Sequence, residues 1–303
     1  MREKSDIIIC EVININTYIL LALSIACAFA NNVTLHKFSN RGLDGMRGVL
    51  CFNSLASVVW IILLCSKGIV SGLAFDAGSI VWGIVYGLVS AAFLLCKMQA
   101  LATGPVSLTS FIGCSSLLIS TGFGVFVLHE GATILQTVGV VLLCVSLFLT
   151  VAPKTGAAKK SWKYWCAAFF VCSAATGIIF KLQQRSASAE KVDEMLIVSA
   201  VTAAFIFALT AVIVPGKSKP GVPKSALFYA LLCGIFACVY NRLNVTLSGA
   251  LPGVVFFPIF NGSVIILSTL AGLIFFGERL KGSQIAGMVI GVAALMLASG
   301  SFG

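Results

Sequence analysis

The stretch ALPGVVFFPIFNGSVIILSTLAGLIFFGERLKGSQIAGMVIGVAAL, residues 250–295, repeats residues 102–147, ATGPVSLTSFIGCSSLLISTGFGVFVLHEGATILQTVGVVLLCVSL, without a gap. Both copies are apolar over a length that spans a membrane. A glutamate interrupts each copy at the same place, Glu130 in the first and Glu278 in the second. Many secondary transporters are built from a duplicated hydrophobic unit of this kind. The repeat therefore predicts a membrane protein and favours a carrier among membrane proteins.

The composition excludes an ordinary soluble domain. Hydrophobic residues make up 59% of the chain and charged residues 10%, whereas soluble domains carry about 25% charged residues. Each bilayer-spanning helix needs about 20 mostly apolar residues. Ten stretches meet that requirement, near residues 17–37, 46–66, 77–100, 105–128, 131–152, 162–183, 194–214, 225–248, 251–276 and 283–300. We therefore expect an all-α integral membrane protein with ten transmembrane helices and short loops.

The remaining global features predict no additional class of site. Residues 1–16 are polar, and no small-residue cleavage site follows the first apolar run, so we expect the first span to be retained. Nearly all of the eleven cysteines lie inside spans and none forms a C-x-x-C pair. We expect them to pack as small apolar residues, with no metal and no cofactor. The net charge of +10 is scattered over short loops, which excludes a nucleic-acid partner.

The chain divides most simply into two five-span repeats. Residues 1–152 form the first, residues 161–303 the second, and residues 153–160 a linker that is rich in lysine and contains proline and glycine. An odd number of spans per repeat inverts the second copy relative to the first, as in alternating-access carriers. In the weaker alignment of the first spans, Lys37 corresponds to Lys181 and Arg41 to Arg185.

Ten spans place both ends of the chain on one side of the membrane. The loops on that side carry six basic residues: Arg2, Lys4, Lys67, Lys181, Arg185 and Lys191. The opposite loops carry twelve: Lys37, Arg41, Arg47, Lys154, Lys159, Lys160, Lys163, Lys217, Lys219, Lys224, Arg279 and Lys281. Because cytoplasmic loops are enriched in lysine and arginine, this count puts both ends of the chain outside.

Lys97 and Arg242 are basic residues inside predicted spans, at nearly corresponding positions of the repeat. The acidic residues fall near the N-terminus, in loops or at span junctions, so no carboxylate is expected mid-span. A charge at membrane depth is costly unless it meets water, a partner or a ligand. An anionic substrate group is one candidate partner. The alternative is that both side chains snorkel to the interface or bind backbone carbonyls.

Polar and aromatic side chains recur at helical spacing near the two cations. We expect a hydrophilic cavity between the spans. Its candidate substrate-binding residues are Lys97, Arg242, Asn241, Asn244, Tyr86, Trp82, Asn32, Thr109, Ser116 and Asn261. The alternative for any single serine or threonine is ordinary hydrogen bonding between membrane helices.

The repeat carries a motif at its second-last loop. The motif consists of an apolar span, a glutamate, a short polar turn, a glutamine and a glycine. The first copy has FVLHE at 126–130 with Gln136 and Gly139, and the second has FFGERL at 275–280 with Gln284 and Gly287. With the ten-span arrangement, this pattern resembles the EamA-like branch of the drug/metabolite transporter superfamily over the whole chain. His129 departs from the pattern, because the second copy has Gly277 there.

The resemblance implies a ten-helix carrier with cytoplasmic termini, a central cavity, and structural roles for Glu130 and Glu278. The implied orientation is opposite to the one that the basic residues favour, and the sequence leaves both open.

Our first functional hypothesis is a transporter of a small polar metabolite across the cell membrane, with Lys97 and Arg242 contacting an anionic group. The alternative is an exporter of amphipathic or aromatic compounds or drugs that uses the Trp82 and Tyr86 face. An enzyme is the least favoured class, because a nucleophile with its base, or a metal cluster, is not apparent in the spans. The expected partners are the lipid bilayer and the small molecule, with the protein a monomer or homodimer.

Overall fold

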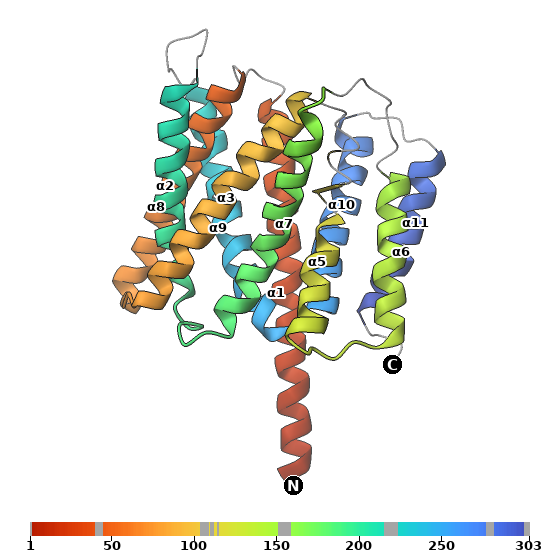
Figure 1. Ribbon diagram of the computed structural model, residues 1–303. Coiled ribbons are helices and arrows are strands. Elements are labelled where there is room, and N and C mark those ends of the chain that lie inside the picture. Colours follow the sequence, from red (N-terminus) through yellow and green to blue (C-terminus); the bar gives the residue numbers. More distant parts are fainter. Residues whose placement is uncertain are drawn as a thin grey trace.

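In the computed structural model, every regular element of the described residues is a helix (Figure 1). The structure describes residues 2–39, 45–103, 109, 112–113, 115–150, 159–214, 224–276 and 282–299. Its helices are α1 (Arg2–Ser39), α2 (Gly45–Ser71), α3 (Ala77–Thr103), α5 (Leu117–Gly122), the π-helix η1 (Phe123–Val127), α6 (Ile134–Thr150), α7 (Trp162–Gln184), α8 (Val192–Ile213), α9 (Lys224–Ala250), α10 (Gly253–Phe276) and α11 (Gly282–Ala298).

Seven of these helices are long and apolar enough to cross a membrane. Their apolar segments are Asn16–Leu35, Met46–Ile69, Ala77–Thr103, Trp162–Gln184, Val192–Ile213, Leu227–Ala250 and Gly253–Ala271. The described helices at three other predicted spans are apolar but shorter: Leu117–Val127, Ile134–Leu149 and Gly282–Ala298. The expectation of an all-helical, multi-pass membrane protein is therefore confirmed, while ten spans remain a prediction. The predicted linker at 153–160 lies almost entirely outside the described residues.

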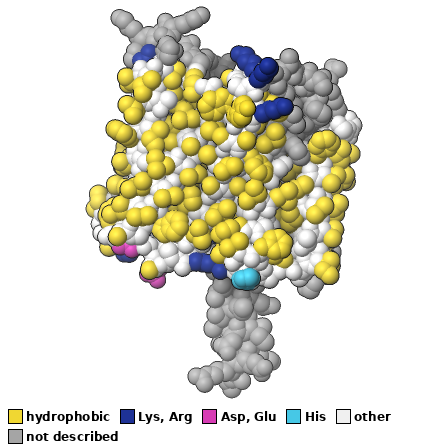
Figure 2. Space-filling model, viewed as in Figure 1, with side chains coloured by type: hydrophobic (Ala, Val, Ile, Leu, Met, Phe, Trp, Pro, Cys, Tyr) yellow, Lys and Arg dark blue, Asp and Glu magenta, His cyan; other side chains and the backbone are white. Residues whose placement is uncertain are grey.

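The surface of the bundle is apolar where lipid would contact it. Large hydrophobic side chains cover its middle, and the charged side chains gather at its two ends (Figure 2). Ile134 and Phe126, for example, expose 82% and 79% of their surface. Soluble monomers rarely expose apolar patches of this extent, whereas a bilayer solvates them.

The two ends of the bundle differ in what they hold. We call the end with the turns at residues 72–76 and 185–191 the terminal end, because α1 begins and α11 ends on that side (Figure 1). The opposite end, where α3 ends and α7 begins, is the far end.

The helices pack largely across the two halves of the chain. Helix α8 packs against both α2 and α3, and α9 packs against both α1 and α2. Elsewhere α7 packs against α3, α10 against α5 and η1, and α6 against α11. Met195 and Leu196 of α8 are completely buried in the largest apolar cluster.

Helices α6 and α11 approach each other closely because small residues line their contact. A Cβ on Gly139 would lie 2.7 Å from the backbone nitrogen of Ala298 and 2.9 Å from the carbonyl oxygen of Ala294. About two turns further along α6, the Ser146 hydroxyl donates to the Gly287 carbonyl over 2.7 Å. Close backbone approach of this kind is how membrane helices gain packing energy.

Gly139→Ala is expected to lower the free energy of unfolding by about 1–3 kcal/mol, because the added methyl forces the α11 backbone away. Gly122→Ala is the matched control, since its Cβ would meet only Phe126 carbons at 3.8 Å or more. Thermal unfolding in detergent micelles measures both variants. Equal stability of the two would contradict the close contact.

Candidate functional site

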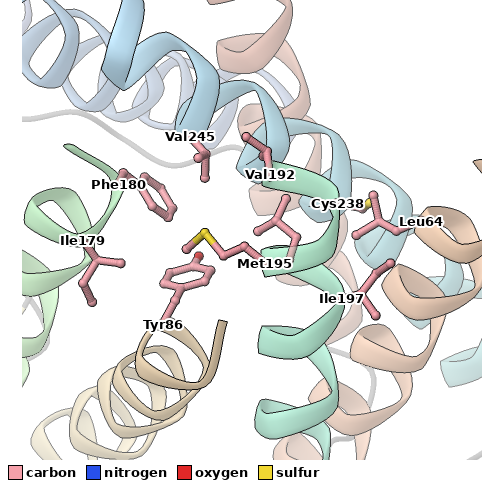
Figure 3. Close-up of a cluster of buried hydrophobic side chains, with 10 residues drawn as sticks. Leu64, Tyr86, Ile179, Phe180, Val192, Met195, Ile197, Cys238 and Val245 are labelled. Atoms are coloured by element: carbon pink, nitrogen blue, oxygen red, sulfur yellow. The ribbon is translucent and has the colours of Figure 1, made fainter. Parts of the chain in front are cut away.

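Tyr86 of α3 and Asn241 of α9, two predicted site residues, meet in the interior of the bundle. The Tyr86 hydroxyl donates to the Asn241 Oδ1 over 2.7 Å, and the Asn241 Nδ2 donates to the Ala237 carbonyl over 2.8 Å. Both residues are buried. Figure 3 shows the Tyr86 ring beside Met195 and Phe180 in the apolar cluster, which Trp82 also contacts from its edge. The two residues predicted to bind substrate therefore do lie together, but here they bind each other in a contact between α3 and α9.

Two predicted asparagines join α1 to its neighbours. The Ser24 hydroxyl donates to the Oδ1 of Asn244 over 2.6 Å in the buried contact of α1 with α9. The Nδ2 of Asn32 donates to the Ser268 hydroxyl on α10 over 3.4 Å, at an exposed position. Asn32 is therefore the one of this pair that a solute could reach.

The predicted hydroxyl residues before α5 bind α7. The Trp162 indole nitrogen donates to Thr109 Oγ1 over 3.0 Å, and the Ser116 hydroxyl lies 2.6 Å from that of Ser173. Asn261 donates to the carbonyl of Phe257 on its own helix over 2.9 Å. These contacts fit the alternative that polar residues hold membrane helices together.

Arg242 has an acidic partner, which corrects the premise that no acid meets the cations inside the spans. Its Nε donates to Asp193 Oδ1 over 2.6 Å, and Lys67 of α2 pairs with the other oxygen of the same carboxylate. The sequence placed Asp193 in a loop, but it lies in the first turn of α8. This carboxylate therefore links α2, α8 and α9.

Lys97 lies far from Arg242, near the far end. Its exposed ammonium is 5.8 Å from the centre of the Phe93 ring, which in turn lies 5.1 Å from Phe169. Lys97 follows Tyr86 by eleven residues (97 − 86), a rise of about 16 Å along α3. Since Tyr86 contacts the neighbour of Arg242, the two cations are separated by a similar distance along the bundle. They do not form one site in this conformation.

The most densely bonded charged group of the described residues is Glu130, at the terminal end. Its Oε1 accepts from the Lys181 ammonium over 2.6 Å and from Arg185 over 3.2 Å. Its Oε2 accepts from the backbone N–H of Gly253, the first residue of α10, over 2.6 Å. Lys181 is 2% exposed and also donates to the Leu251 carbonyl over 2.7 Å. One carboxylate thus joins the segment after η1 to α7 and α10.

The local backbone explains how Glu130 reaches this position. The π-helix η1 ends in a turn in which His129 has a φ of 53° and the Glu130 N–H donates to the Gly124 carbonyl over 3.0 Å. A Cβ on Gly124 would lie 2.7 Å from Glu130 Oε2, so this glycine leaves room for the carboxylate. The matching Glu278, and the side chains of Lys37 and Arg41, lie outside the described residues.

Further contacts at the terminal end join the two halves of the chain. The Ala74 N–H donates to Glu194 Oε1 over 3.0 Å, and the Ser188 hydroxyl donates to Asp76 Oδ2. With the Glu130 and Asp193 ion pairs, we call these the terminal-end contacts. Apart from the Asp193–Arg242 pair, each joins a residue before the linker to one after it. Sequence reasoning missed them because it treated each loop separately. Within the described chain no three acidic, histidine or cysteine side chains form a metal-binding group.

The comparisons with known proteins bear on the fold alone. No protein-family model matches the chain, and no curated protein matches it. A solved structure described only as the crystal structure of a protein superposes with a TM-score of 0.74 and 14% sequence identity, over 94% of this chain and 96% of that one. The whole described bundle is therefore a fold that occurs in a solved protein.

Glu130→Gln is expected to lower the free energy of unfolding by about 3–5 kcal/mol, because it leaves the Lys181 charge buried without its partner. Adding Lys181→Met should restore part of that loss, because the buried charge is then removed. Glu190→Gln, at an exposed glutamate, is the control. If thermal unfolding gave Glu130→Gln and Glu190→Gln the same stability, the Glu130 contacts would not stabilise the fold.

Asp76, just before α3, is expected to titrate far below its ordinary range. Hydrogen bonds from the Ser188 hydroxyl and from the hydroxyl and backbone N–H of Ser79 lower the pKa of Asp76 from 3.8 to about 2. Since the folded-state value is the lower one, the stabilisation is fully present above about pH 4 and is lost as the pH falls through 2. Carbon NMR titration of the carboxyl measures this. Ser188→Ala should raise the pKa of Asp76, whereas Ser66→Ala should not, because the Ser66 hydroxyl donates to the Leu63 carbonyl instead.

Proposed function

We propose that this protein is a secondary carrier of a small polar metabolite, built from two inverted five-helix repeats and working by alternating access in the cell membrane. The paired packing of the helices is the observation that carries the proposal. Transport, rather than catalysis, accounts for a chain that is almost entirely apolar helix with charged groups at its ends.

The repeat relates α1 to α7, α2 to α8, α3 to α9 and α6 to α11. Under that relation, each main contact between the halves has a counterpart. α1 packs on α9 as α7 packs on α3, and α3 packs on α8 as α9 packs on α2. Two further contacts, α2 with α8 and α6 with α11, each join a helix to its own equivalent in the other half. This pattern supports a two-fold relation between halves of opposite direction, which is the architecture that exchanges two access states.

The terminal-end contacts fit one of those two states. In alternating access, each end of the carrier opens in turn, so contacts that hold one end together must break in half of the cycle. Glu130 with Lys181, and Asp193 with Lys67, join the two halves at the terminal end. We infer that the structure corresponds to the state in which the terminal end is closed.

The substrate contact that we propose is Lys97 rather than the Lys97–Arg242 pair. Lys97 is exposed beside the Phe93 ring, whereas Arg242 holds Asp193. An anionic group entering from the far end would meet Lys97 first. The alternative, an exporter of aromatic compounds, has less support, because Tyr86 is buried in the apolar cluster and Trp82 packs against it.

Purified protein in liposomes, supplied with labelled amino acids, organic acids and phosphorylated sugars, tests the proposal. Uptake of at least one compound class, with counterflow, is expected. Lys97→Gln should raise the KM for an anionic substrate about tenfold, the loss of one hydrogen bond to a charged group. Lys97→Arg should retain most of the affinity, and Lys191→Gln, at the terminal end, is the matched control.

The outcomes separate the two parts of the proposal. Uptake of no compound by the folded wild-type protein would contradict the carrier. Transport with an unchanged KM in Lys97→Gln would contradict only the role of Lys97. Arg242→Gln is expected to reduce thermal stability and the rate of transport while leaving the KM in place, because Arg242 acts through Asp193.

A further inference from the structure

Three lysines lie together where the chain enters α7 at the far end. Lys159, Lys160 and Lys163 fall within five residues of one another, and all three side chains are exposed. No hydrogen bond or ion pair to their ammonium groups occurs among the residues that the structure describes. Their charges are therefore available to a partner outside the described chain.

Aromatic residues adjoin these lysines in the sequence. Trp162, Tyr164 and Trp165 belong to the first turn of α7, which starts an apolar segment long enough to cross a membrane. Tyr164 exposes 79% of its surface and Trp165 36%. Tryptophan and tyrosine collect at the level of the lipid headgroups, because their rings are apolar at one edge and polar at the other. The aromatic residues thus place the lysines at the membrane–water interface. We call these six residues the basic–aromatic platform.

The backbone holds the platform in a fixed position. The Lys159 N–H donates to the carbonyl of Thr103, at the end of α3, over 2.9 Å, and the Trp162 N–H donates to the Lys159 carbonyl over 3.0 Å. The Trp162 indole is held by Thr109 over 3.0 Å. The lysines are therefore presented from an ordered turn that joins two helices.

The charge of the two ends differs among the described side chains. The terminal end has five basic residues, Lys67, Lys181, Arg185, Lys191 and Arg242, and five acidic ones, Asp76, Glu130, Glu190, Asp193 and Glu194. The far end has five basic residues, Arg47, Lys97, Lys159, Lys160 and Lys163, and none of the described acidic ones. Among these described side chains, the terminal end is thus neutral in sum and the far end carries +5.

From this geometry we propose that the basic–aromatic platform binds the anionic headgroups of the lipid leaflet at the far end. The phosphodiester of phosphatidylglycerol carries the negative charge that the described residues do not offer to the three ammonium groups. Its glycerol and acyl region lies at the depth of the tryptophan and tyrosine rings. The site is independent of the transport cycle and does not use Lys97.

We infer the orientation of the chain from the platform together with the count of basic residues. Anionic lipid gives the cytoplasmic leaflet its negative surface potential, so the far end faces the cytoplasm. In the ten-span topology that the sequence predicts, the loops on that side carry twelve of the basic residues, against six on the other side, which is the direction that the positive-inside rule requires. The ends of the chain therefore lie outside, opposite to the orientation implied by the family resemblance.

Quenching of tryptophan fluorescence by brominated lipids tests the lipid site. In a Trp60→Phe, Trp82→Phe background, Trp162 and Trp165 are the reporters. We expect brominated phosphatidylglycerol to compete for the platform better than brominated phosphatidylcholine. Each lysine replaced by glutamine should lower the relative association constant roughly fivefold, and salt should weaken the preference. The Lys159→Arg, Lys160→Arg, Lys163→Arg variant keeps the charge and should keep the preference.

Two results would overturn the site. One is equal quenching of Trp162 and Trp165 by both lipids when the three lysines are present. The other is an unchanged preference for phosphatidylglycerol in the Lys159→Gln, Lys160→Gln, Lys163→Gln variant. The stabilisation of full-length wild-type protein by added phosphatidylglycerol, measured as a shift in Tm, checks the result without the tryptophan substitutions.

Reporter fusions after residue 303 in bacterial cells test the orientation. Alkaline phosphatase should be active there and green fluorescent protein should not fluoresce. The reverse result would overturn the orientation and leave the lipid site to the quenching experiment. Neither experiment depends on the carrier function. Failure of the transport assay in liposomes is therefore distinguishable from failure of the lipid site.

Discussion

The ionic contacts of Glu130 are the interaction on which the junction of the two halves depends. A carboxylate that is largely removed from water needs several partners, and Glu130 has three: Lys181, Arg185 and the first N–H of α10. The positive end of the α10 dipole adds to this stabilisation. Because Lys181 is itself almost fully buried, neither charge could be present alone at this depth without a large desolvation cost.

The same electrostatic constraint organises the rest of the terminal end. Asp193 satisfies two cations from different helices, Lys67 and Arg242. The Asp193 pairs suit a protein that has two states, since the partly exposed Lys67 and Arg242 side chains can exchange their protein partner for solvent at small net cost. The far end has a different character, because the lysines at the start of α7 are exposed and the described residues hold no acidic side chain there.

The polar residues inside the spans illustrate what a sequence pattern can locate. Proximity to Arg242 along the chain selected Asn241 and Asn244. Helical spacing selected Tyr86 and Ser116, and all four residues form hydrogen bonds in the interior of the bundle. It did not distinguish side chains that line a cavity from those that bind each other, because spacing along one helix contains no information about the facing helix. Hydrogen bonds between helices use most of the predicted set. Lys97 and Asn32 are the exposed members.

By itself, the sequence determined that this is a membrane protein, that its fold is helical, and where the duplicated unit lies. These follow from the length of apolar runs and from local periodicity, which each segment carries alone. Only the tertiary structure decided the partners of the charges, such as Asp193 for Arg242 and Lys181 for Glu130. It also separated Lys97 from Arg242. Lys97 lies toward the far end and Arg242 pairs with Asp193 at the terminal end, so two cations that nearly correspond in sequence are kept apart in space.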